Sequence, residues 1–342
     1  STFVQMIGPP SAFTHCVGSA SKSKFSRPRP IDPKSMTVCD VTRRHFLEGA
    51  AAGVAALGLP EMPYAMEPVM QRAIPKSGEL LPMVGLGTWR AFDVSDTSDM
   101  RAPQREVIQL MFEAGGSVVD ASPMYGRAEG VVGDLLAETE DRRRAFLATK
   151  VWTEGRDRGI AQMEESLRQM RTDVIDLMQI HNLIDWRTQL ETLRLWKAAG
   201  IFRYIGITHY SSHAIDDLVA VMENEDIDFV QMAYSIGERA VEDKLLPVAA
   251  ERGIAIIVNR PYEGGNLFAS ITGESLPDWA QEFDCTTWSQ FFLKFVMSHP
   301  AVTCVIPATS KPNHMIDNLA AGRGRLPDDA MRRRMIQYWE DV

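Results

Sequence analysis

A short apolar run followed by a helical pattern recurs along the chain, and this repeat constrains the fold more than any other feature. The first run covers residues 82–87, and later runs begin near Ser117, Phe146, Ile175, Arg203, Phe229, Ile254 and Thr303. From Ser117 to Ile254, successive starts lie 25 to 29 residues apart. Runs of this length indicate buried parallel strands, and the spacing leaves room for one helix between neighbours. We therefore predict an α/β fold, a (β/α)8 TIM barrel.

The segments between the runs carry apolar residues at helical spacing. Two such faces are Val107, Leu110, Met111 and Ala114, and later Trp288, Phe291, Phe292 and Phe295. A short hairpin over 74–80 is expected to precede the first barrel strand, and an extra helix is expected at the C-terminal end. Residues 75–342 are predicted to form a single domain.

An open doubly wound sheet is the alternative way to arrange alternating strands and helices. Such a sheet binds a dinucleotide through a glycine-rich turn, but residues 85–90 lack the third glycine and the helix start of that motif. The last interval of the repeat is 49 residues, which predicts an insertion at about 259–286. Loops of that length are usually functional or mobile.

The N-terminal region differs in composition from the rest. Residues 1–35 are rich in Ser and Pro, basic and without periodicity, so we predict a disordered extension. Residues 36–65 contain the basic pair Arg43-Arg44 followed by an apolar run at 49–59, which is the layout of a signal peptide. This segment resembles a twin-arginine signal. The resemblance implies the twin-arginine export machinery as a partner and a periplasmic or exported location.

Several alternatives stay open for this region. The basic pair could begin an amphipathic helix, in which case the signal is not functional and the protein is cytoplasmic. A transit peptide would also be Ser-rich, basic and acid-poor. Translation could start at Met36, in which case residues 1–35 are not part of the translated protein. Because the apolar run is too short for a membrane span, we expect no stable membrane insertion.

Composition argues against two other classes of function. The chain has 342 residues and a formal net charge of −9, and no basic stripe is present, which argues against nucleic acid as a partner. The four cysteines are widely spaced, and no His-x-His or Glu/His cluster has the spacing of a metal site. We therefore expect no bound metal.

Polar side chains stand at the ends of three neighbouring predicted strands. Asp120 ends the second strand, with Tyr125 just beyond it; Lys150 ends the third and His181 the fourth. A buried lysine needs a partner, and Asp120 is available. A cation near a phenol lowers its pKa, which would make Tyr125 a general acid. With His181 orienting a carbonyl oxygen and no Ser or Cys placed to attack, the pattern indicates an external hydride donor.

Three motifs carry a family resemblance: Val119–Gly126, Thr149–Val151 and Gln179–Asn182 resemble the Asp/Tyr/Lys/His tetrad of the aldo/keto reductases. The resemblance runs from about residue 82 to residue 321. It implies a TIM barrel that binds an extended nicotinamide cofactor without a Rossmann domain. It also implies that Tyr125 is the proton donor, that Lys150 and Asp120 tune it, and that His181 orients the substrate carbonyl.

The resemblance assigns cofactor contacts along the chain. Those on the nicotinamide side are the first-strand loop Gly87, Thr88 and Trp89, the carboxamide-binding residues Thr208, His209 and Gln231, and the pair Asn259 and Arg260. The Asn259-Arg260 pair stands where the family has a stacking tyrosine, so Arg260 is expected to replace it as a flat cation. His209 replaces the family's asparagine and can still donate and accept.

A second motif before the last helix of the barrel resembles the family's clamp for the adenosine phosphate. Its residues are Thr309, Ser310, Lys311, His314, Asp317 and Asn318. Small hydroxyl residues before a helix N-terminus suit a phosphate, and Lys311 can supply charge where His314 replaces the usual arginine. We therefore favour NADP(H) over NAD(H).

These inferences predict an NAD(P)H-dependent carbonyl reductase that converts a small-molecule carbonyl substrate, an aldehyde or a ketone, to an alcohol, reversibly. Trp89, Trp152, Trp186 and Tyr262 are expected to line the substrate mouth. Two alternatives belong to other classes: a nicotinamide-binding regulatory protein of the same fold with little turnover, and a metal-dependent barrel hydrolase using Asp120 and His181.

Overall fold

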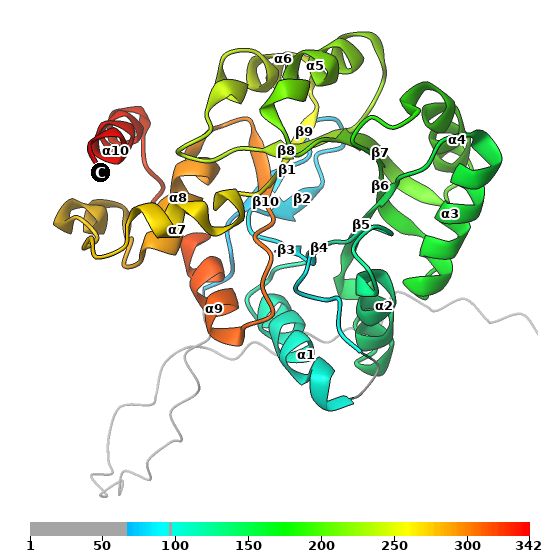
Figure 1. Cartoon of the computed structure of the whole chain (residues 1–342), viewed down its shortest axis with the longest axis horizontal. Coiled ribbons are helices and arrows are strands. Elements are labelled where there is room, and N and C mark those ends of the chain that lie inside the picture. Colours follow the sequence, from blue (N-terminus) through cyan, green and yellow to red (C-terminus); the bar gives the residue numbers. More distant parts are fainter. Residues whose placement is uncertain (1–66, 96–97) are drawn as a thin grey trace, which may run out of the picture. The chain divides into compact units, whose positions relative to one another are not determined.

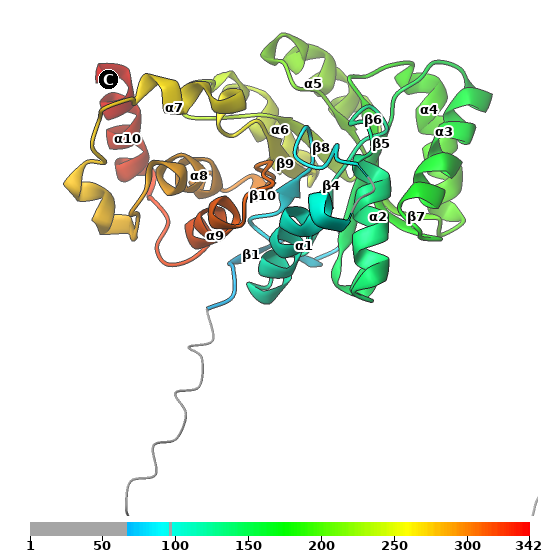
Figure 2. The same cartoon turned by 60° about the horizontal axis from the view of Figure 1, so that its bottom comes forward.

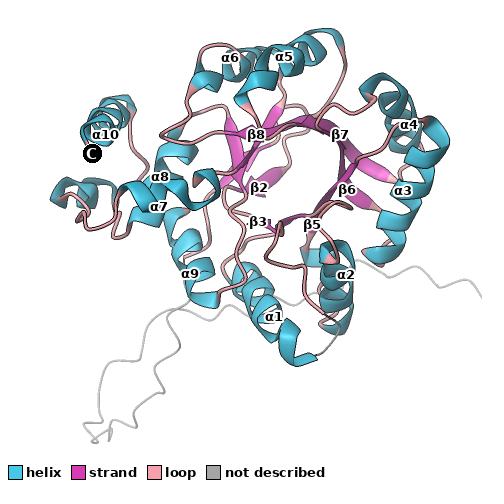
Figure 3. Ribbon diagram, in the orientation of Figure 1, coloured by secondary structure: helices cyan, strands magenta, loops and turns pink. Residues whose placement is uncertain are grey.

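The computed structural model of the protein describes residues 67–95 and 98–342, and its centre is a ring of eight parallel strands (Figures 1 and 3). The strands are β3 (Leu86–Gly87), β4 (Val118–Asp120), β5 (Phe146–Val151), β6 (Ile175–His181), β7 (Phe202–Thr208), β8 (Phe229–Ala233), β9 (Ala255–Asn259) and β10 (Val302–Val305). They pair in chain order, and bridges from Val84 to Val305 and from Gly87 to Ala308 close the ring. The predicted (β/α)8 barrel is confirmed. The predicted extension 1–35 and signal segment 36–65 lie outside the described residues.

Helices surround the ring. They are α1 (Ser98–Glu113), α2 (Ala128–Glu138), α3 (Arg156–Gln169), α4 (Trp186–Ala198), α5 (Ile215–Asn224), α6 (Leu245–Arg252), α7 (Asn266–Ser270), α8 (Trp288–Ser298), α9 (Pro312–Ala321) and α10 (Asp329–Asp341). The predicted extra helix is α10, which lies beside α8 (Figures 1 and 2) through the ring contact of Trp339 with Phe292. No helix in the described part of the chain is long and apolar enough to cross a membrane.

The predicted hairpin is formed by β1 (Gln71–Ala73) and β2 (Leu80–Pro82), and it closes one end of the barrel. Ile74 and Leu81 from this hairpin belong to the same buried cluster as Phe146 and Phe229, whose side chains fill the barrel interior. The first barrel strand is shorter than the predicted run 82–87, because Pro82 pairs with Gln71 in the hairpin before the chain enters the barrel. At Gly87 the backbone approaches its neighbour so closely that an added Cβ would lie 2.6 Å from the Ile306 carbonyl oxygen.

Strand periodicity decides which side chains point into the barrel. Phe146 and Ala148 of β5 lie in the inner cluster, whereas Leu147 and Val151 belong to the outer one beneath the helices. Side chains alternate across a strand, so the next inward residue of β5 is Lys150. The same alternation along the other strands places the following side chains on the inner side at the carboxyl ends: Asp120, Gln179, His181, Thr208, Gln231 and Asn259. An apolar barrel floor therefore carries a polar upper layer.

The predicted insertion after β9 is folded. It contains the short helix α7 and two 3₁₀ helices, Glu263–Gly265 and Asp278–Phe283. Tyr262, Phe268 and Phe292 pack edge to face or tilted against one another, with ring centroids 5.0 to 6.5 Å apart, which holds the start of the insertion against α8. The insertion thus forms a wall above the barrel on the side of α8 and α9.

Candidate active site

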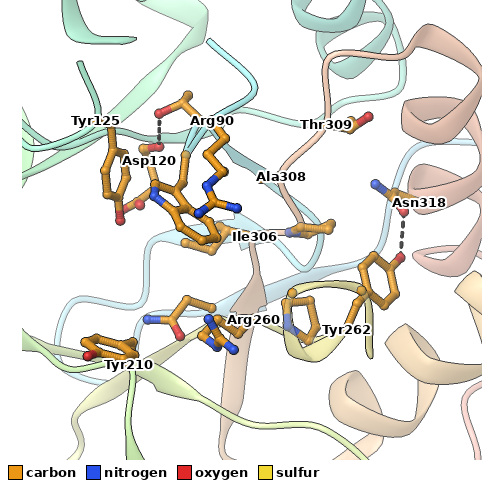
Figure 4. A pocket seen from close by; sticks show the side chains of 18 of the residues that line it. Arg90, Asp120, Tyr125, Tyr210, Arg260, Tyr262, Ile306, Ala308, Thr309 and Asn318 are labelled. Atoms are coloured by element: carbon orange, nitrogen blue, oxygen red, sulfur yellow. Dashed lines mark hydrogen bonds between the residues drawn. The ribbon is translucent and has the colours of Figure 1, made fainter. Parts of the chain in front are cut away.

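A cavity of about 1170 Å³ opens at the carboxyl ends of the strands. Figure 4 shows Tyr125 and Asp120 at one end of this cavity and Thr309, Asn318 and Tyr262 at the other. Most of the predicted site residues line it: Gly87, Thr88, Trp89, Asp120, Tyr125, His181, Thr208, Gln231, Asn259, Arg260, Thr309, His314, Asp317 and Asn318. The polar upper layer of the barrel is therefore the floor of a single elongated site.

A buried ion pair lies beneath one end of the cavity. Lys150 Nζ lies 2.6 Å from Asp120 Oδ2 and also donates to the carbonyl oxygen of Ala121 at 2.7 Å. Burial alone would lower the pKa of Lys150, but the charges of Asp120 and Tyr125, with hydrogen bonding to both, raise it overall. The lysine is therefore held in its charged form. It lies behind the cavity wall.

Asp120 also connects to the side where a cofactor is predicted. Its Oδ1 accepts a hydrogen bond from Gln231 Nε2 at 2.7 Å and from Gln179 Nε2 at 3.3 Å. Gln231 Oε1 in turn accepts from Thr208 Oγ1 and Asn259 Nδ2, each at 3.3 Å. Gln179 was not among the predicted site residues, although the inward alternation of its strand could have identified it. One network thus joins Lys150 to Thr208 and Asn259, the last residues of β7 and β9.

Tyr125 stands over the ion pair. Lys150 Nζ lies 5.0 Å from the centroid of the phenol ring. Burial raises the pKa of Tyr125, the charge of Lys150 opposes this, and the net pKa is above the ordinary value. The predicted lowering is therefore wrong in its net direction, because desolvation of the phenolate outweighs the attraction of the ammonium. The phenol is a protonated group with a cation placed to stabilise its anion.

His181 faces Tyr125 edge to face, with the ring centroids 6.0 Å apart. Burial, followed by the charges of Lys150 and His209, lowers the pKa of His181 to about 3. The imidazole is consequently neutral at neutral pH. Its Nδ1 lies 3.1 Å from Ser122 Oγ, and the Trp152 ring is tilted toward it with the ring centroids 6.4 Å apart. A neutral imidazole beside a protonated phenol is an arrangement that can hold a carbonyl oxygen between two donors.

The far end of the cavity is built by the insertion and α9. Asn318 Oδ1 accepts hydrogen bonds from Tyr262 (2.7 Å) and Ser289 (3.1 Å). Asp317 accepts from Thr287 Oγ1 at 3.0 Å and from Gln290 Nε2 at 2.7 Å. These predicted adenine-side residues therefore tie α9 to the start of α8 and to the insertion.

Some predicted residues do not line the cavity. They are Lys150, which lies behind the wall, His209, Ser310, Lys311 and the proposed mouth residue Trp186, while Trp89, Trp152 and Tyr262 do line it. His209 instead stacks on Tyr210, with ring centroids 5.3 Å apart, and its Nδ1 accepts from Ser211 N at 3.0 Å. Lys311 occupies the N-cap position of α9, and its side chain makes no capping hydrogen bond there.

Several lining residues escaped the sequence prediction. They are Arg90, Met124, Asn182, Tyr210, Pro261, Gly264, Gly265, Phe268, Thr287, Trp288, Ser289, Ile306, Pro307 and Ala308. Many belong to the insertion or its edges, where no periodic pattern indicates which side chains face a cavity. Arg90 lies with its guanidinium carbon 4.3 Å from the centroid of the Trp89 ring. Arg260 has no ion-pair partner among residues 67–95 and 98–342.

A metal centre finds no support in this site. Within the described part of the chain, no group of three or more His, Cys, Asp or Glu side chains is placed to hold a metal ion. Asp120 and His181, the pair required by the hydrolase alternative, are instead engaged by Lys150 and Ser122 respectively.

Comparison with known proteins gives consistent matches. Residues 83–335 match the profile of the aldo/keto reductase family. The methylglyoxal reductase YeaE of Escherichia coli (strain K12) is 26% identical over 260 residues, which cover 74% of this chain and 89% of that protein. The glyoxal reductase of Bacillus subtilis (strain 168) is 23% identical over 250 residues, covering 71% and 83%.

A solved structure has the same fold. The aldo/keto reductase from Klebsiella pneumoniae in complex with NADP and acetate matches with a TM-score of 0.67 and 22% identity, over 80% of this chain and 96% of that chain.

Proposed function

Because the chain belongs to the aldo/keto reductase family and is an NAD(P)-dependent oxidoreductase, we propose that it reduces aldehydes or ketones to alcohols at the Tyr125 end of the cavity. One observation carries this proposal. The buried pair of Lys150 and Asp120, the phenol of Tyr125 and the neutral imidazole of His181 gather at one end of a cavity of about 1170 Å³.

The proposed roles follow from the charges. A bound nicotinamide would supply the hydride that the carbonyl carbon receives. Tyr125 breaks its O–H bond and gives the proton to the carbonyl oxygen, and the ammonium of Lys150 stabilises the phenolate that remains. Asp120 keeps Lys150 charged and in place, and His181 orients the carbonyl oxygen. In the oxidation direction the same phenolate takes the proton back from the alcohol.

Two buried amide oxygens support the fit of a nicotinamide cofactor. Asn182 Oδ1 and Asn259 Oδ1 have no hydrogen-bond partner within the described residues, and both residues line the cavity. A buried acceptor without a partner is costly, and a carboxamide NH₂ is a donor that such acceptors need. Arg260 offers an uncommitted cation for the nicotinamide or pyrophosphate part of the same molecule.

We further propose NADP(H) rather than NAD(H). Thr309 and His314 line the cavity beside the N-terminus of α9, and Lys311 is the N-cap residue of that helix. A helix N-terminus with hydroxyl and basic residues suits a phosphate monoester, which NADP carries and NAD lacks. The NADP complex of the Klebsiella pneumoniae protein is consistent with this preference.

Purification followed by one assay series tests the proposal. The protein is titrated with NADPH and with NADH by fluorescence, then assayed over a panel of aldehydes and ketones that includes methylglyoxal and glyoxal, because two relatives are named for these substrates. Carbonyl-dependent oxidation of NADPH is expected. Tight binding of NADPH with no turnover on any carbonyl would favour the regulatory alternative instead.

Export is a separate proposal that rests on the Arg43-Arg44 segment. If residues 36–65 act as a twin-arginine signal, protein recovered from the native host should begin near residue 66. N-terminal sequencing of that protein tests this, and a chain that retains Arg43-Arg44 outside the cytoplasm would contradict cleavage at this segment.

A further inference from the structure

Ser122 and His181 form a hydrogen bond that none of the proposed catalytic roles uses. Ser122 lies two residues beyond Asp120, in the loop that leads to Tyr125, and His181 is the last residue of β6. Ser122 Oγ lies 3.1 Å from His181 Nδ1. Both side chains are buried, with exposed fractions of 0% for Ser122 and 6% for His181. The Ser122 hydroxyl therefore cannot exchange this partner for bulk water.

The donors and acceptors around Ser122 decide the direction of this bond. In the described part of the chain, Ser122 Oγ has one further hydrogen bond, which it accepts from Met124 N at 3.3 Å. If Nδ1–H of His181 donated to Ser122, the proton of the fully buried Ser122 hydroxyl would be left without an acceptor, which is unfavourable. The hydroxyl can donate only to His181 Nδ1, so Nδ1 is the acceptor and its lone pair is unprotonated.

The surroundings exclude the doubly protonated ring as well. Burial is the largest effect that lowers the pKa of His181, and the charges of Lys150 on β5 and of His209 just after β7 add to it. From the other sides the ring meets the phenol of Tyr125 and the indole of Trp152, neither of which is an anion. The carboxylate of Asp120 belongs to the same polar layer of the barrel, and its oxygens are occupied by Lys150, Gln179 and Gln231.

We propose that Ser122 is a positioning residue that fixes His181 as the neutral tautomer with its proton on Nε2. The Nε2 atom has no hydrogen-bond partner within the described residues, and His181 lines the cavity. The fixed tautomer therefore offers the cavity a hydrogen-bond donor. Sequence spacing gave no sign of this role, because a serine in a loop after a strand is common.

The tautomer matters for the reaction, and this part of the inference rests on the proposed function. With Nε2–H, His181 donates to the carbonyl oxygen in the ground state and to the more negative oxygen of the transition state. With Nδ1–H, the same ring would present a lone pair to that oxygen and repel it. Ser122 thus makes His181 a hydrogen-bond donor that does not transfer its proton. Tyr125 remains the group that gives a proton to the carbonyl oxygen.

Nitrogen NMR of the histidine rings tests the tautomer directly, without substrate or turnover. The full chain is labelled with ¹⁵N-histidine, and the signals of His181 are assigned by their loss in His181→Asn. We expect an unprotonated Nδ1 and a protonated Nε2 that stay unchanged from pH 8 to pH 5. A protonated Nδ1, or a ring that gains charge in this range, would overturn the proposal whatever the variants do.

Substitutions then test whether Ser122 is the cause. Ser122→Ala is expected to mix the two tautomers and to lower kcat about three- to tenfold, less than the 10²-fold typical of losing a donor outright. Ser122→Thr keeps the hydroxyl and should restore the single tautomer and most of kcat. Ser289→Ala removes a different hydroxyl of the cavity wall, which contacts Tyr262 and Asn318, and should leave the His181 signals unchanged. An unaltered tautomer and kcat in Ser122→Ala would show that Ser122 has no such role.

The two readouts separate this inference from the proposed function. If no carbonyl is turned over but His181 shows the expected tautomer, then the proposed function fails and the hydrogen-bond assignment stands. If carbonyls are turned over but the wild-type Nδ1 is protonated, the reductase proposal stands and the role of Ser122 is wrong.

Discussion

Lys150 Nζ and Asp120 Oδ2 lie 2.6 Å apart on adjacent strands, and the side chains are 0% and 3% exposed. A charge pair this deeply buried gains its stability only while both partners are present, because either charge alone would be left without water or a counter-ion. The pair therefore affects folding as well as the chemistry proposed for Tyr125.

Lys150→Met should destabilise the protein by about 3–5 kcal/mol, since it leaves the Asp120 carboxylate buried without its cation. Urea unfolding at pH 7.5 measures the loss. The double variant Lys150→Met with Asp120→Asn removes both charges and should recover part of the stability. A double variant that shows the full sum of the two single losses would argue that the pair is not coupled.

Tyr125→Phe should lower kcat for carbonyl reduction at least about 100-fold, because it removes the proposed proton donor. The phenyl ring keeps the same place above Lys150, so the affinity for NADPH should change little. Tyr338→Phe is a matched control, because Tyr338 lies on α10, does not line the cavity, and stacks on Trp288 through a ring that phenylalanine keeps. Turnover by Tyr125→Phe equal to that of this control would remove Tyr125 from the mechanism.

The low pKa of His181, about 3 in the folded protein against 6.5 as its ordinary value, predicts a stability loss in acid. Below pH 6.5 the unfolded chain takes up a proton at this residue that the folded protein takes up only near pH 3. The free energy of unfolding should therefore fall as the pH decreases through this window, by up to about 1.4 kcal/mol per pH unit.

Urea unfolding of the wild type and His181→Asn at pH 7.5, 6 and 5 isolates this contribution. Other titrating groups act in both proteins, so the difference between the two slopes reports His181. The wild type should lose more stability toward pH 5 than the variant does. Parallel pH dependence in the two proteins would mean that His181 titrates normally.

Arg260→Gln should weaken NADPH and NADH binding by a similar factor of about ten, equivalent to about 1.4 kcal/mol, if Arg260 contacts a part that both cofactors share. Lys311→Gln should weaken NADPH binding alone, because only that cofactor carries the additional phosphate. Fluorescence titration at two salt concentrations measures both effects. Arg334→Gln serves as the control, since Arg334 lies over the Trp279 ring away from the cavity. A loss confined to NADPH in Arg260→Gln would place that residue at the additional phosphate instead.

Most strand starts were predictable from the sequence to within about one residue, as for β5 at Phe146 and β6 at Ile175. The reason is that buried parallel strands need unbroken apolar runs. The first strand was the exception. Its run was continuous with the second hairpin strand, and only the pairing of Pro82 with Gln71 separates the two.

The gathering of the four predicted catalytic candidates was also predictable from the sequence, because polar residues that end apolar strands meet at the carboxyl end of a parallel barrel. Some of the contacts among these four residues were predictable, such as the ion pair of Lys150 with Asp120. The net pKa of Tyr125 was not, because the size of the burial effect depends on what covers the ring. The lining residues Arg90, Asn182 and Phe268 were missed because loops carry no periodic signal.

The sequence by itself determined the barrel, its strand order and the set of polar residues at its carboxyl end, since hydrophobic periodicity and short connections leave little choice of topology. Only the tertiary structure decided which groups meet across the barrel. The bond from Ser122 to His181 joins residues 59 positions apart. Such a bond exists only when β4 and β6 close toward one axis, because distance in space between side chains is set by the packed barrel rather than by spacing along the chain.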